Sequence, residues 1–284
     1  MNQEIKTALV VEGGGMRGIF AAGVLDCFFE NGFDPFDSYV GVSAGACNLS
    51  SHLAGQYMRN YRCYMDYMSR PDFISLSKYL RGGHYMDLDW FWEYGRQVDP
   101  LDVDAASKKE FHIVTTDAET GAPIYFVARP DTLLDVLKGS SAIPLLYRNF
   151  VEVENHILMD GGISDPIPIE FAIQKGANRI MVLRSRAKNY IKNDFIESKI
   201  VPFFFNNNHE LRRALFKRAS RYNESIAFIK SPPKGIDILE ICPTIIRSDR
   251  TTQDKTILKC DYIEGKRVGR VAMKRWKNLI SDFR

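Results

Sequence analysis

The fold of this chain is decided by two stretches near its start, TALVVEGGGMRGIFAAGVLDCFFE at residues 7–30 and SYVGVSAGA at residues 38–46. In each stretch a short apolar run predicts a buried strand of the kind found in parallel sheets. Glycines or small residues follow, and the residues after them predict a helix; Asn31-Gly32 ends the first helix. The order strand, helix, strand, helix is typical of α/β proteins.

The composition indicates one large soluble domain. The 284 residues are 45% hydrophobic and 26% charged, which is enough for a substantial core. A net charge of +3 is too small to indicate a nucleic-acid partner, so none is expected. The five cysteines lack C-x-x-C spacing, which argues against disulfides or structural zinc. Without a signal-peptide pattern or an apolar run of ~20 residues, we expect a cytoplasmic protein that can still touch a membrane surface.

Further strands and helices are predicted along the rest of the chain. The strands cover residues 111–116, 122–127, 155–159, 179–184 and 236–241, and the helices cover 131–138, 168–175, 209–230 and 262–280. Gly139 and Gly176 are placed as the ends of two of these helices. Residues 59–104 are rich in Tyr, Trp, Met and Asp and predict an irregular or helical excursion packed around a site.

The glycine-rich loop Gly13-Gly-Gly-Met-Arg-Gly18 also matches the dinucleotide-binding pattern G-x-G-x-x-G. That function needs a carboxylate at the end of the second strand, but this strand ends in Val40-Gly-Val-Ser43. A phosphate-binding P-loop is excluded because no Gly-Lys-Ser/Thr follows. Two interpretations stay open: an oxyanion hole, in which the glycines let amide N–H groups approach a substrate, or a purely structural tight turn.

A second motif, Gly41-Val-Ser-Ala-Gly45, has the pattern G-x-S-x-G and lies between a predicted strand and a predicted helix. In this setting the serine occupies a sharp, strained turn, and the flanking glycines remove side chains that would clash. The motif predicts that Ser43 is a nucleophile facing the N-terminus of the helix that starts at Ala44. The alternative is that Ser43 only caps this helix.

A serine nucleophile needs a base, and no histidine is well placed for that role. The histidines are His52, within the second helix and pointing away, His112 and His156, in strands, and His84 and His209, in irregular or polar segments. Only His209 follows Asp160, as the Ser–Asp–His order of a triad requires.

Asp160 is a better candidate for the base. It ends an apolar strand, and Gly161-Gly162 after it let the chain bend toward a site. A carboxylate that is partly withdrawn from water binds a proton more strongly, so Asp160 can take the Ser43 proton directly. The alternative is an ordinary Asp-Gly turn.

With Gly13–Gly18, Gly41–Gly45 and Asp160–Gly162 in this order, the chain resembles the patatin-like phospholipase family. That family has a glycine-rich oxyanion loop ending in Arg-Gly, a G-x-S-x-G turn, and a D-G-G/A motif whose aspartate pairs with the serine. The turn Gly139-Ser-Ser-Ala-Ile-Pro144 and a helix entered through Pro166 and Pro168 add to the resemblance. It implies a three-layer α/β/α fold with a mainly parallel central sheet. The catalytic domain is then expected at residues 7–185, and residues 186–284 are expected as an extension with basic helices packed on the same domain.

The resemblance implies hydrolysis of lipid acyl esters, of the phospholipase A or lysophospholipase type, without metal or cofactor. Ser43 attacks the ester carbonyl, Asp160 accepts its proton, and an acyl-serine intermediate is then hydrolysed. The amides expected to hold the oxyanion are those of Gly13, Gly14, Gly15 and Ala44. The supporting positions are Arg17, Gly18, Gly41, Gly45, Gly161 and Gly162. Arg17 either orients a phosphate or pairs with a carboxylate.

Two other functions stay open: a catalytically silent lipid-binding or regulatory protein, and a Ser-His-Asp hydrolase of small soluble esters. The lipid, the oligomeric state and the choice between hydrolysis and acyl transfer are not set by the sequence. Basic residues gather at 209–230 and 262–280, and Phe203-Phe-Phe205 precedes them. They predict either helices that lie on anionic lipid or solvated basic faces above a packed apolar one, and the second is favoured.

Overall fold

The computed structural model describes residues 5–193, 205 and 208–281, and these residues form an eight-stranded sheet. The strand order is β5-β6-β3-β2-β1-β7-β8, and β4 pairs with β3 outside this order. The strands are β1 (Thr7–Val11), β2 (Ser38–Val42), β3 (Glu110–Asp117), β4 (Pro123–Val127), β5 (Val151–Val153), β6 (His156–Asp160), β7 (Arg179–Leu183) and β8 (Asp237–Ile241). The predicted strands are confirmed; β5 was missed because three residues are too short to show a pattern.

Helices and helical turns connect the strands. The α-helices are α1 (Ile19–Glu30), α2 (Ala44–Leu53), α3 (Arg59–Arg62), α4 (Leu76–Leu80), α5 (Leu88–Val98), α6 (Val103–Ala106), α7 (Leu133–Ser140), α8 (Ile169–Gln174), α10 (His209–Lys230) and α11 (Lys255–Ser281). A π-helical turn, η2 (Cys63–Met68), and two 3-10 turns, η1 (Gly15–Gly18) and η3 (Gly161–Ile163), are also present. The excursion predicted at residues 59–104 is therefore mostly helical.

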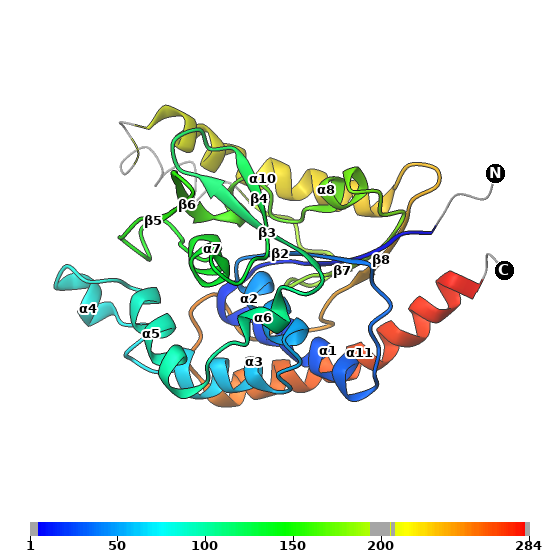
Figure 1. The fold of residues 1–284 in the computed structure, drawn as a ribbon, viewed down its shortest axis with the longest axis horizontal. Helices are drawn as coiled ribbons and strands as arrows, with labels where there is room; N and C mark the ends of the chain where they lie inside the picture. The colour runs from blue at the N-terminus through cyan, green and yellow to red at the C-terminus, as the bar shows by residue number, and fades with distance from the viewer. Residues whose placement is uncertain (1–4, 194–204, 206–207, 282–284) are drawn as a thin grey trace.

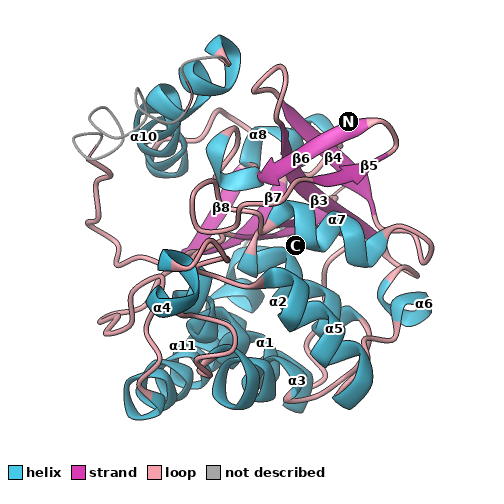
Figure 2. Cartoon of the chain, turned by 90° about the vertical axis from the view of Figure 1, so that its left-hand side faces the viewer, coloured by secondary structure: helices cyan, strands magenta, loops and turns pink. Residues whose placement is uncertain are grey.

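The sheet is mainly parallel and has helices on both faces. Its central part is parallel and contains five strands in the order β3, β2, β1, β7 and β8. β4 and β6 run antiparallel to β3, and β5 runs antiparallel to β6. Figures 1 and 2 show α1, α2 and α11 on one face of the sheet and α8 and α10 on the other. This arrangement confirms the predicted three-layer α/β/α architecture.

The alternation of side chains along the strands divides the core between the two faces. Leu9 and Val11 of β1 belong to an apolar cluster with α1 and α11, whereas Ala8 and Val10 belong to a cluster with α8 and α10. Every residue of β1, β2 and β7 is buried, as expected for central strands of a parallel sheet. The sheet thus forms a rigid platform, and the loops at the carboxyl ends of β1 and β2 carry the two glycine motifs.

Helix α7 ends later than predicted. Gly139, expected as its end, lies inside the helix. A Cβ at this position would lie 2.7 Å from the Cβ of Leu158 on β6. The glycine therefore allows the helix to pack closely on the strand rather than ending it.

Helix α11 begins at Lys255 rather than at the predicted Tyr262. The carboxylate of Asp254 accepts the N–H groups of Thr256 and Ile257, at 2.7 and 3.2 Å, and so caps the first turn. Asp254 is the signal in the sequence that marks this start.

The basic helices α10 and α11 both bury an apolar face in the protein. The buried side of α10 includes Tyr222 and Ile226, which belong to the same apolar cluster as Ala8 and Val10 of β1. The buried side of α11 includes Leu258 and Trp276, which belong to the cluster on the opposite face of the sheet, with α1. This packing favours the solvated basic face over a helix that lies in lipid. Within the described residues, no helix is long and apolar enough to cross a membrane.

The aromatic run before α10 is described only in part. Phe203 and Phe204 lie outside the described residues. Phe205 is half-buried and packs against a small apolar cluster that includes Leu211 and Leu215. Its side chain therefore contributes to internal packing.

Candidate active site

Ser43 occupies a sharp turn between β2 and α2. Its backbone has φ 53° and ψ −128°, a strained combination for a residue with a side chain. A Cβ at Gly41 would lie 2.5 Å from Ala46 Cα, and one at Gly45 would lie 2.7 Å from the carbonyl oxygen of Glu12. Both flanking positions therefore have room only for glycine, and the turn presents the serine side chain at the end of the sheet.

Ser140 holds this turn in place. The N–H of Ser43 donates to Ser140 Oγ at 2.8 Å, and that hydroxyl donates to the carbonyl of Val114 on β3 at 2.6 Å. Because the Ser43 N–H is used in this way, it is not a donor for an oxyanion. Sequence analysis missed the role of Ser140, although it lies in the small-residue turn that was singled out at residues 139–144.

The glycine loop lies against the nucleophile. A Cβ at Gly13 would lie 2.8 Å from Ser43 Cβ, so only glycine allows this approach. Ser185 Oγ donates to the Gly13 carbonyl at 2.7 Å and so fixes the orientation of the following peptide. In the described part of the chain, the N–H groups of Gly13 and Gly14 donate to no acceptor. These amides are therefore available to a substrate oxygen.

The remaining glycines of the predicted site are in close contact with neighbouring atoms. A Cβ at Gly14 would lie 2.7 Å from Ser185 Oγ, and one at Gly18 would collide with the hydroxyl of Tyr64. Gly15 has φ +57° and lines both cavities described below. Ala44, at the N-terminus of α2, is buried beside Ser43.

Strand register brings Asp160 to Ser43. Val42, at the end of β2, pairs with Val114, and Asp160, at the end of β6, pairs with the next residue, Thr115. Because β4 occupies the other side of β3 along residues 112–116, β2 and β6 share one side and meet end to end. The residues that follow these two strand ends are therefore neighbours in space.

Asp160 and Ser43 line the same cavity and are 4% and 5% exposed. Asp160 Oδ1 accepts the N–H of Gly162 at 2.8 Å, which orients the carboxylate. A Cβ at Gly161 would collide with the carbonyl of Val114, so this turn also requires glycine. Ser43 Oγ and the Asp160 carboxylate face the same cavity without a hydrogen bond between them.

No histidine is among the described residues that line this cavity. His52 is half-buried on α2, and desolvation lowers its pKa to about 4. Its charged neighbours are Asp34 and Lys109, at the other end of β2. Two more histidines are engaged with carboxylates, His156 with Asp117 at 2.9 Å and His112 with Glu110 at 3.2 Å; His209 is exposed at the start of α10.

Ser43 lies between two cavities of opposite character. One, the polar cavity, has a volume of about 240 Å³, and its lining includes Asp160 and Arg17. The other, the apolar cavity, has a volume of about 50 Å³ and is lined mainly by α2 and residues 59–92. Gly15, Ser43 and Ile143 belong to both. An ester at Ser43 can therefore have its acyl group on one side and its alcohol group on the other.

Among the described residues, Arg17 forms no ion pair, which was one of its two expected roles. It is 5% exposed, and its pKa is lowered to about 10 by burial and then by the positive charges of Arg186 and Arg250. The nearby carboxylate of Glu12 instead accepts the N–H of Ser185 at 2.8 Å. Nε of Arg17 has no hydrogen-bond partner among the described residues.

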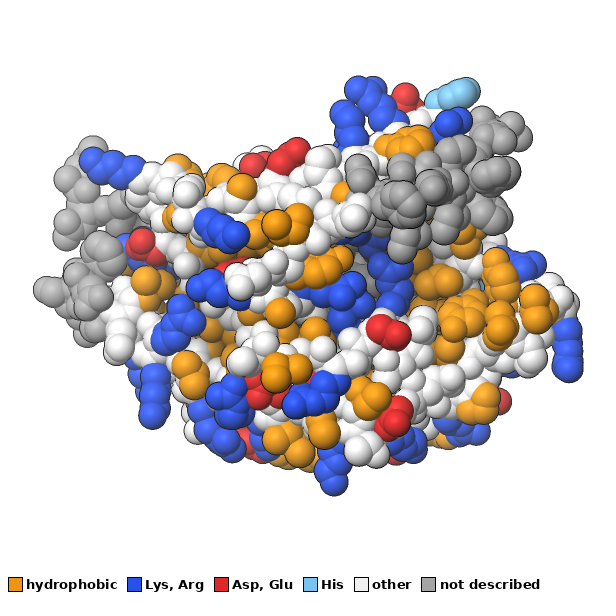
Figure 3. All heavy atoms as spheres, turned by 180° about the vertical axis from the view of Figure 1, so that it is seen from behind, with side chains coloured by type: hydrophobic (Ala, Val, Ile, Leu, Met, Phe, Trp, Pro, Cys, Tyr) orange, Lys and Arg blue, Asp and Glu red, His pale blue; other side chains and the backbone are white. Residues whose placement is uncertain are grey.

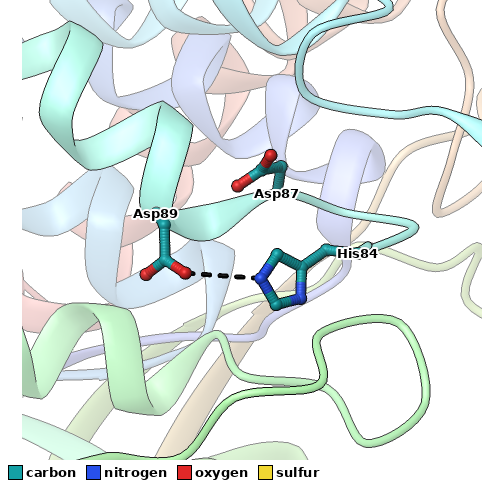
Figure 4. Close-up of side chains that lie close together, drawn as sticks. All are labelled: His84, Asp87 and Asp89. Carbon is teal, nitrogen blue, oxygen red and sulfur yellow. Dashed lines mark ion pairs between the residues drawn. The ribbon is translucent and has the colours of Figure 1, made fainter. Parts of the chain in front are cut away.

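A group of His84, Asp87 and Asp89 has the composition of a metal site (Figure 4). However, Nδ1 of His84 accepts the N–H of Arg148 at 3.1 Å, so Nε2 carries the proton and faces Asp89 at 3.3 Å. Asp87 forms an ion pair with the ammonium group of Lys78, with 3.2 Å between Oδ2 and Nζ. These groups are already used in binding the start of α5 to its neighbours, and none of them lines the polar cavity.

The chain matches the models of two protein families. The model of the family described as "Patatin-like phospholipase" matches residues 9–173, more than half of the chain, and the chain belongs to the patatin-like phospholipase family. A second family model, "Domain of unknown function (DUF6363)", matches residues 208–281. Membership of the first family supports hydrolysis of lipid acyl esters as the general activity.

A curated relative is "Uncharacterized protein YjjU" of Escherichia coli (strain K12), which is 34% identical over 284 residues, 98% of this chain and 80% of the relative. The chain is also similar to the crystal structure of VipD from Legionella pneumophila, with TM-score 0.42, 14% identity and coverage of 94% of this chain and 67% of VipD. For human GIVD cytosolic phospholipase A2 the TM-score is 0.39 with 9% identity, covering 96% of this chain and 63% of that one. Both structural likenesses are distant.

Proposed function

We propose that this protein is a serine hydrolase of lipid acyl esters in which Ser43 is the nucleophile and Asp160 is the base. The observation that carries the proposal is the meeting of β2 and β6 on β3, which places the two side chains in one cavity. The absence of histidine from the described lining of that cavity favours a Ser–Asp dyad over a triad.

In the first step the Ser43 hydroxyl gives its proton to Asp160 while its oxygen bonds to the ester carbonyl carbon. The negative charge on the carbonyl oxygen is held by the amides of Gly13, Gly14, Gly15 and Ala44, with the N-terminus of α2 adding positive potential. The carbon–oxygen bond to the alcohol breaks, and the alcohol leaves with the proton from Asp160. The acyl group stays on Ser43.

In the second step a water molecule gives a proton to Asp160 and attacks the acyl-serine carbonyl. The bond to Ser43 breaks, Ser43 regains its proton, and the fatty acid is released. The same amides stabilise the second oxyanion.

The character of the apolar cavity supports the proposal that it binds the acyl chain of the substrate. Phe73, Met86 and Phe91 are among its lining residues. The charged residue in its described lining, Arg59, donates to the Asp99 carbonyl at 3.1 Å and to Ser51 Oγ at 2.9 Å. Its volume of about 50 Å³ holds only the first few methylene groups. We therefore propose that a long chain requires residues 59–92 to move apart.

The proposal is tested by measuring hydrolysis of a chromogenic acyl ester and of a lysophospholipid. Ser43→Ala is expected to lower kcat/KM on the order of 10⁴-fold or more, and Asp160→Asn by about 10³-fold, because the nucleophile and the base act as a unit. His209→Ala is the matched control, since His209 is exposed, and it is expected to keep full activity.

Two results would contradict the proposal. Full activity of a folded Asp160→Asn protein would remove the dyad, and loss of activity in His209→Ala would restore a triad. Labelling with a fluorophosphonate separates catalysis from lipid binding: wild-type protein that neither reacts at Ser43 nor hydrolyses any ester would be a silent lipid-binding protein.

A further inference from the structure

The region matched by the family of unknown function contacts both catalytic loops. Within residues 208–281, the carbonyl of Arg250 accepts the N–H of Met16 at 3.1 Å, next to the glycine loop. A Cβ at Gly15 would lie 2.6 Å from that same carbonyl oxygen. Arg218 of α10 donates from Nε to the carbonyl of Gly162 at 2.8 Å, next to Asp160. This region therefore forms part of the wall of the active site.

The loop that carries Arg250 is held by hydrogen bonds to a buried carboxylate of helix α11. Asp261 of α11 is fully buried and accepts the N–H of Ser248 at 2.8 Å and its hydroxyl at 2.7 Å. Helix α11 packs on α1 so closely that a Cβ at Gly23 or Gly265 would collide with backbone oxygens of the opposite helix. Because α1 begins directly after the glycine loop, the position of Arg250 relative to that loop is well defined.

The polar cavity is rich in positive charge. Its described lining contains the basic residues Arg17, Arg186, Lys192, Arg218 and Arg250 and the acidic residues Glu12 and Asp160. Four of the five basic residues come from outside the segment matched by the patatin-like family model. The space-filling view in Figure 3 shows Lys and Arg side chains gathered in a hollow near the middle of one face, beside apolar side chains.

Arg17 is the residue that points most directly to a ligand. A guanidinium group that is 5% exposed, with Nε lacking a hydrogen-bond partner among the described residues, is costly to keep without an anion. Arg186 and Arg250 approach it closely enough to depress its pKa, so like charges are held together in one place. An anion with several oxygens would accept hydrogen bonds from Arg17 and balance the positive charge of all three guanidinium groups.

We propose that Arg17, Arg186 and Arg250 form a phosphate subsite beside Ser43, and that the substrate is an acyl ester of glycerol phosphate with a phosphomonoester head group. This inference rests on the proposed function. The phosphomonoester carries between one and two negative charges near pH 7, which suits a cluster of several cations. The volume of about 240 Å³ is smaller than the about 300–1,000 Å³ of a pocket for a drug-sized ligand, so it fits a head group rather than a whole lipid.

The same cavity is poorly suited to a quaternary ammonium head group. Such cations are bound over open aromatic faces. The ring of Tyr190 is already covered by the guanidinium of Arg186, whose Cζ lies 4.3 Å from the ring centroid. The guanidinium of Arg184 likewise lies over the ring of Tyr222, with Cζ 5.7 Å from the ring centroid. A zwitterionic lipid is therefore expected to be the poorer substrate.

Binding is tested first, without turnover, on the full-length Ser43→Ala protein by calorimetry. Glycerol 3-phosphate and an acylated glycerol 3-phosphate are expected to bind more tightly than inorganic phosphate. Arg186→Gln and Arg250→Gln are expected to weaken this binding about tenfold to a hundredfold, because each removes a charge-assisted hydrogen bond. Arg213→Gln, at an exposed arginine on α10, is the control and is expected to bind as the parent does. Equal affinity in all three variants, or inorganic phosphate binding as tightly as the glycerol esters, would overturn the head-group subsite.

Turnover is tested second, on the protein with Ser43 intact. The ratio of kcat/KM for 1-acylglycerol 3-phosphate to that for 1-acylglycerophosphocholine is expected to exceed about ten, and to fall about tenfold in Arg186→Gln. A ratio near one in the wild-type protein would overturn the inference while leaving the hydrolase in place. Glycerol phosphate binding that depends on Arg186 and Arg250, in a protein that hydrolyses none of these esters, would support the subsite and overturn the proposed function.

Discussion

The loops that carry the reacting groups and the region that surrounds them are built in different ways. The glycine loop and the turn at Ser43 are set by local constraints, since backbone atoms would collide if their glycines had side chains. Residues 208–281 contain no such motif and reach the site through long-range contacts, such as that of the Arg250 carbonyl with Met16. The comparison teaches that a motif can mark the reacting atoms while the residues that choose the substrate come from elsewhere in the chain.

The largest expected effect comes from breaking a local constraint. In Gly45→Val the added atoms would meet the carbonyl oxygens of Val11 and Glu12, the second within 2.7 Å of the Cβ, and these backbone atoms cannot move aside. We expect a loss of more than about 4 kcal/mol in the free energy of unfolding, or no soluble protein. Urea denaturation provides the measurement.

The control for this change is Gly95→Ala in helix α5. No atom lies within 4 Å of a Cβ at Gly95, so the variant is expected to gain about 0.5–1 kcal/mol from helix propensity. If Gly45→Val unfolded at the same urea concentration as the wild-type protein, the steric account of the turn would be wrong.

A smaller effect is expected from loosening the C-terminal region. Asp261→Asn replaces a fully buried carboxylate that accepts hydrogen bonds from three donors, the N–H of Arg247 and the N–H and hydroxyl of Ser248. We expect a loss of about 2–3 kcal/mol in the free energy of unfolding, since an amide NH₂ group would face donors. The preference for a phosphomonoester should fall as well, because Arg250 lies on the loop that Asp261 holds. Both are measured on the same protein preparation.

Glu93→Gln, on helix α5, is the control for Asp261. Glu93 pairs with Arg96 at the surface, and exposed pairs of this kind contribute about 0–1 kcal/mol. Equal stability and equal substrate preference in Asp261→Asn and Glu93→Gln would show that the loop does not depend on its buried anchor.

The smallest expected effect on stability comes from Ser140→Ala. This change leaves the buried N–H of Ser43 and the carbonyl of Val114 without their shared partner, which costs about 1–2 kcal/mol. We also expect kcat to fall, because the strained turn at Ser43 loses a restraint. Ser220→Ala, at an exposed serine of α10, serves as the control. Unchanged kcat in Ser140→Ala would mean that the flanking glycines alone hold the turn.

Much of the fold could be predicted because its signals are local. The apolar runs at β1 and β2 and the glycines after them specify strand, loop and helix from neighbours in the chain. The errors fall where tertiary packing overrides a local signal. Gly139, for example, looks like a helix end but is required for the contact of α7 with Leu158.

The candidate site divides in the same way. The positions of Ser43 and the glycine loop follow from their motifs, whereas Ser140 and Ser185 were missed because a serine in a turn gives no sign of a distant partner. Ser43 N and Ser140 Oγ are brought together only by the packing of α7 beside β3.

The sequence by itself determined the α/β order of the chain, the serine turn, the glycine loop and the resemblance to a family, because each depends on adjacent residues. Only the tertiary structure decided that Asp160 shares a cavity with Ser43, since this follows from β2 and β6 meeting on one side of β3. Only the tertiary structure also gathered Arg186 and Arg250 around Arg17. The physical reason is that strand register and helix packing act between residues far apart in the chain, where no sequence pattern records the contact.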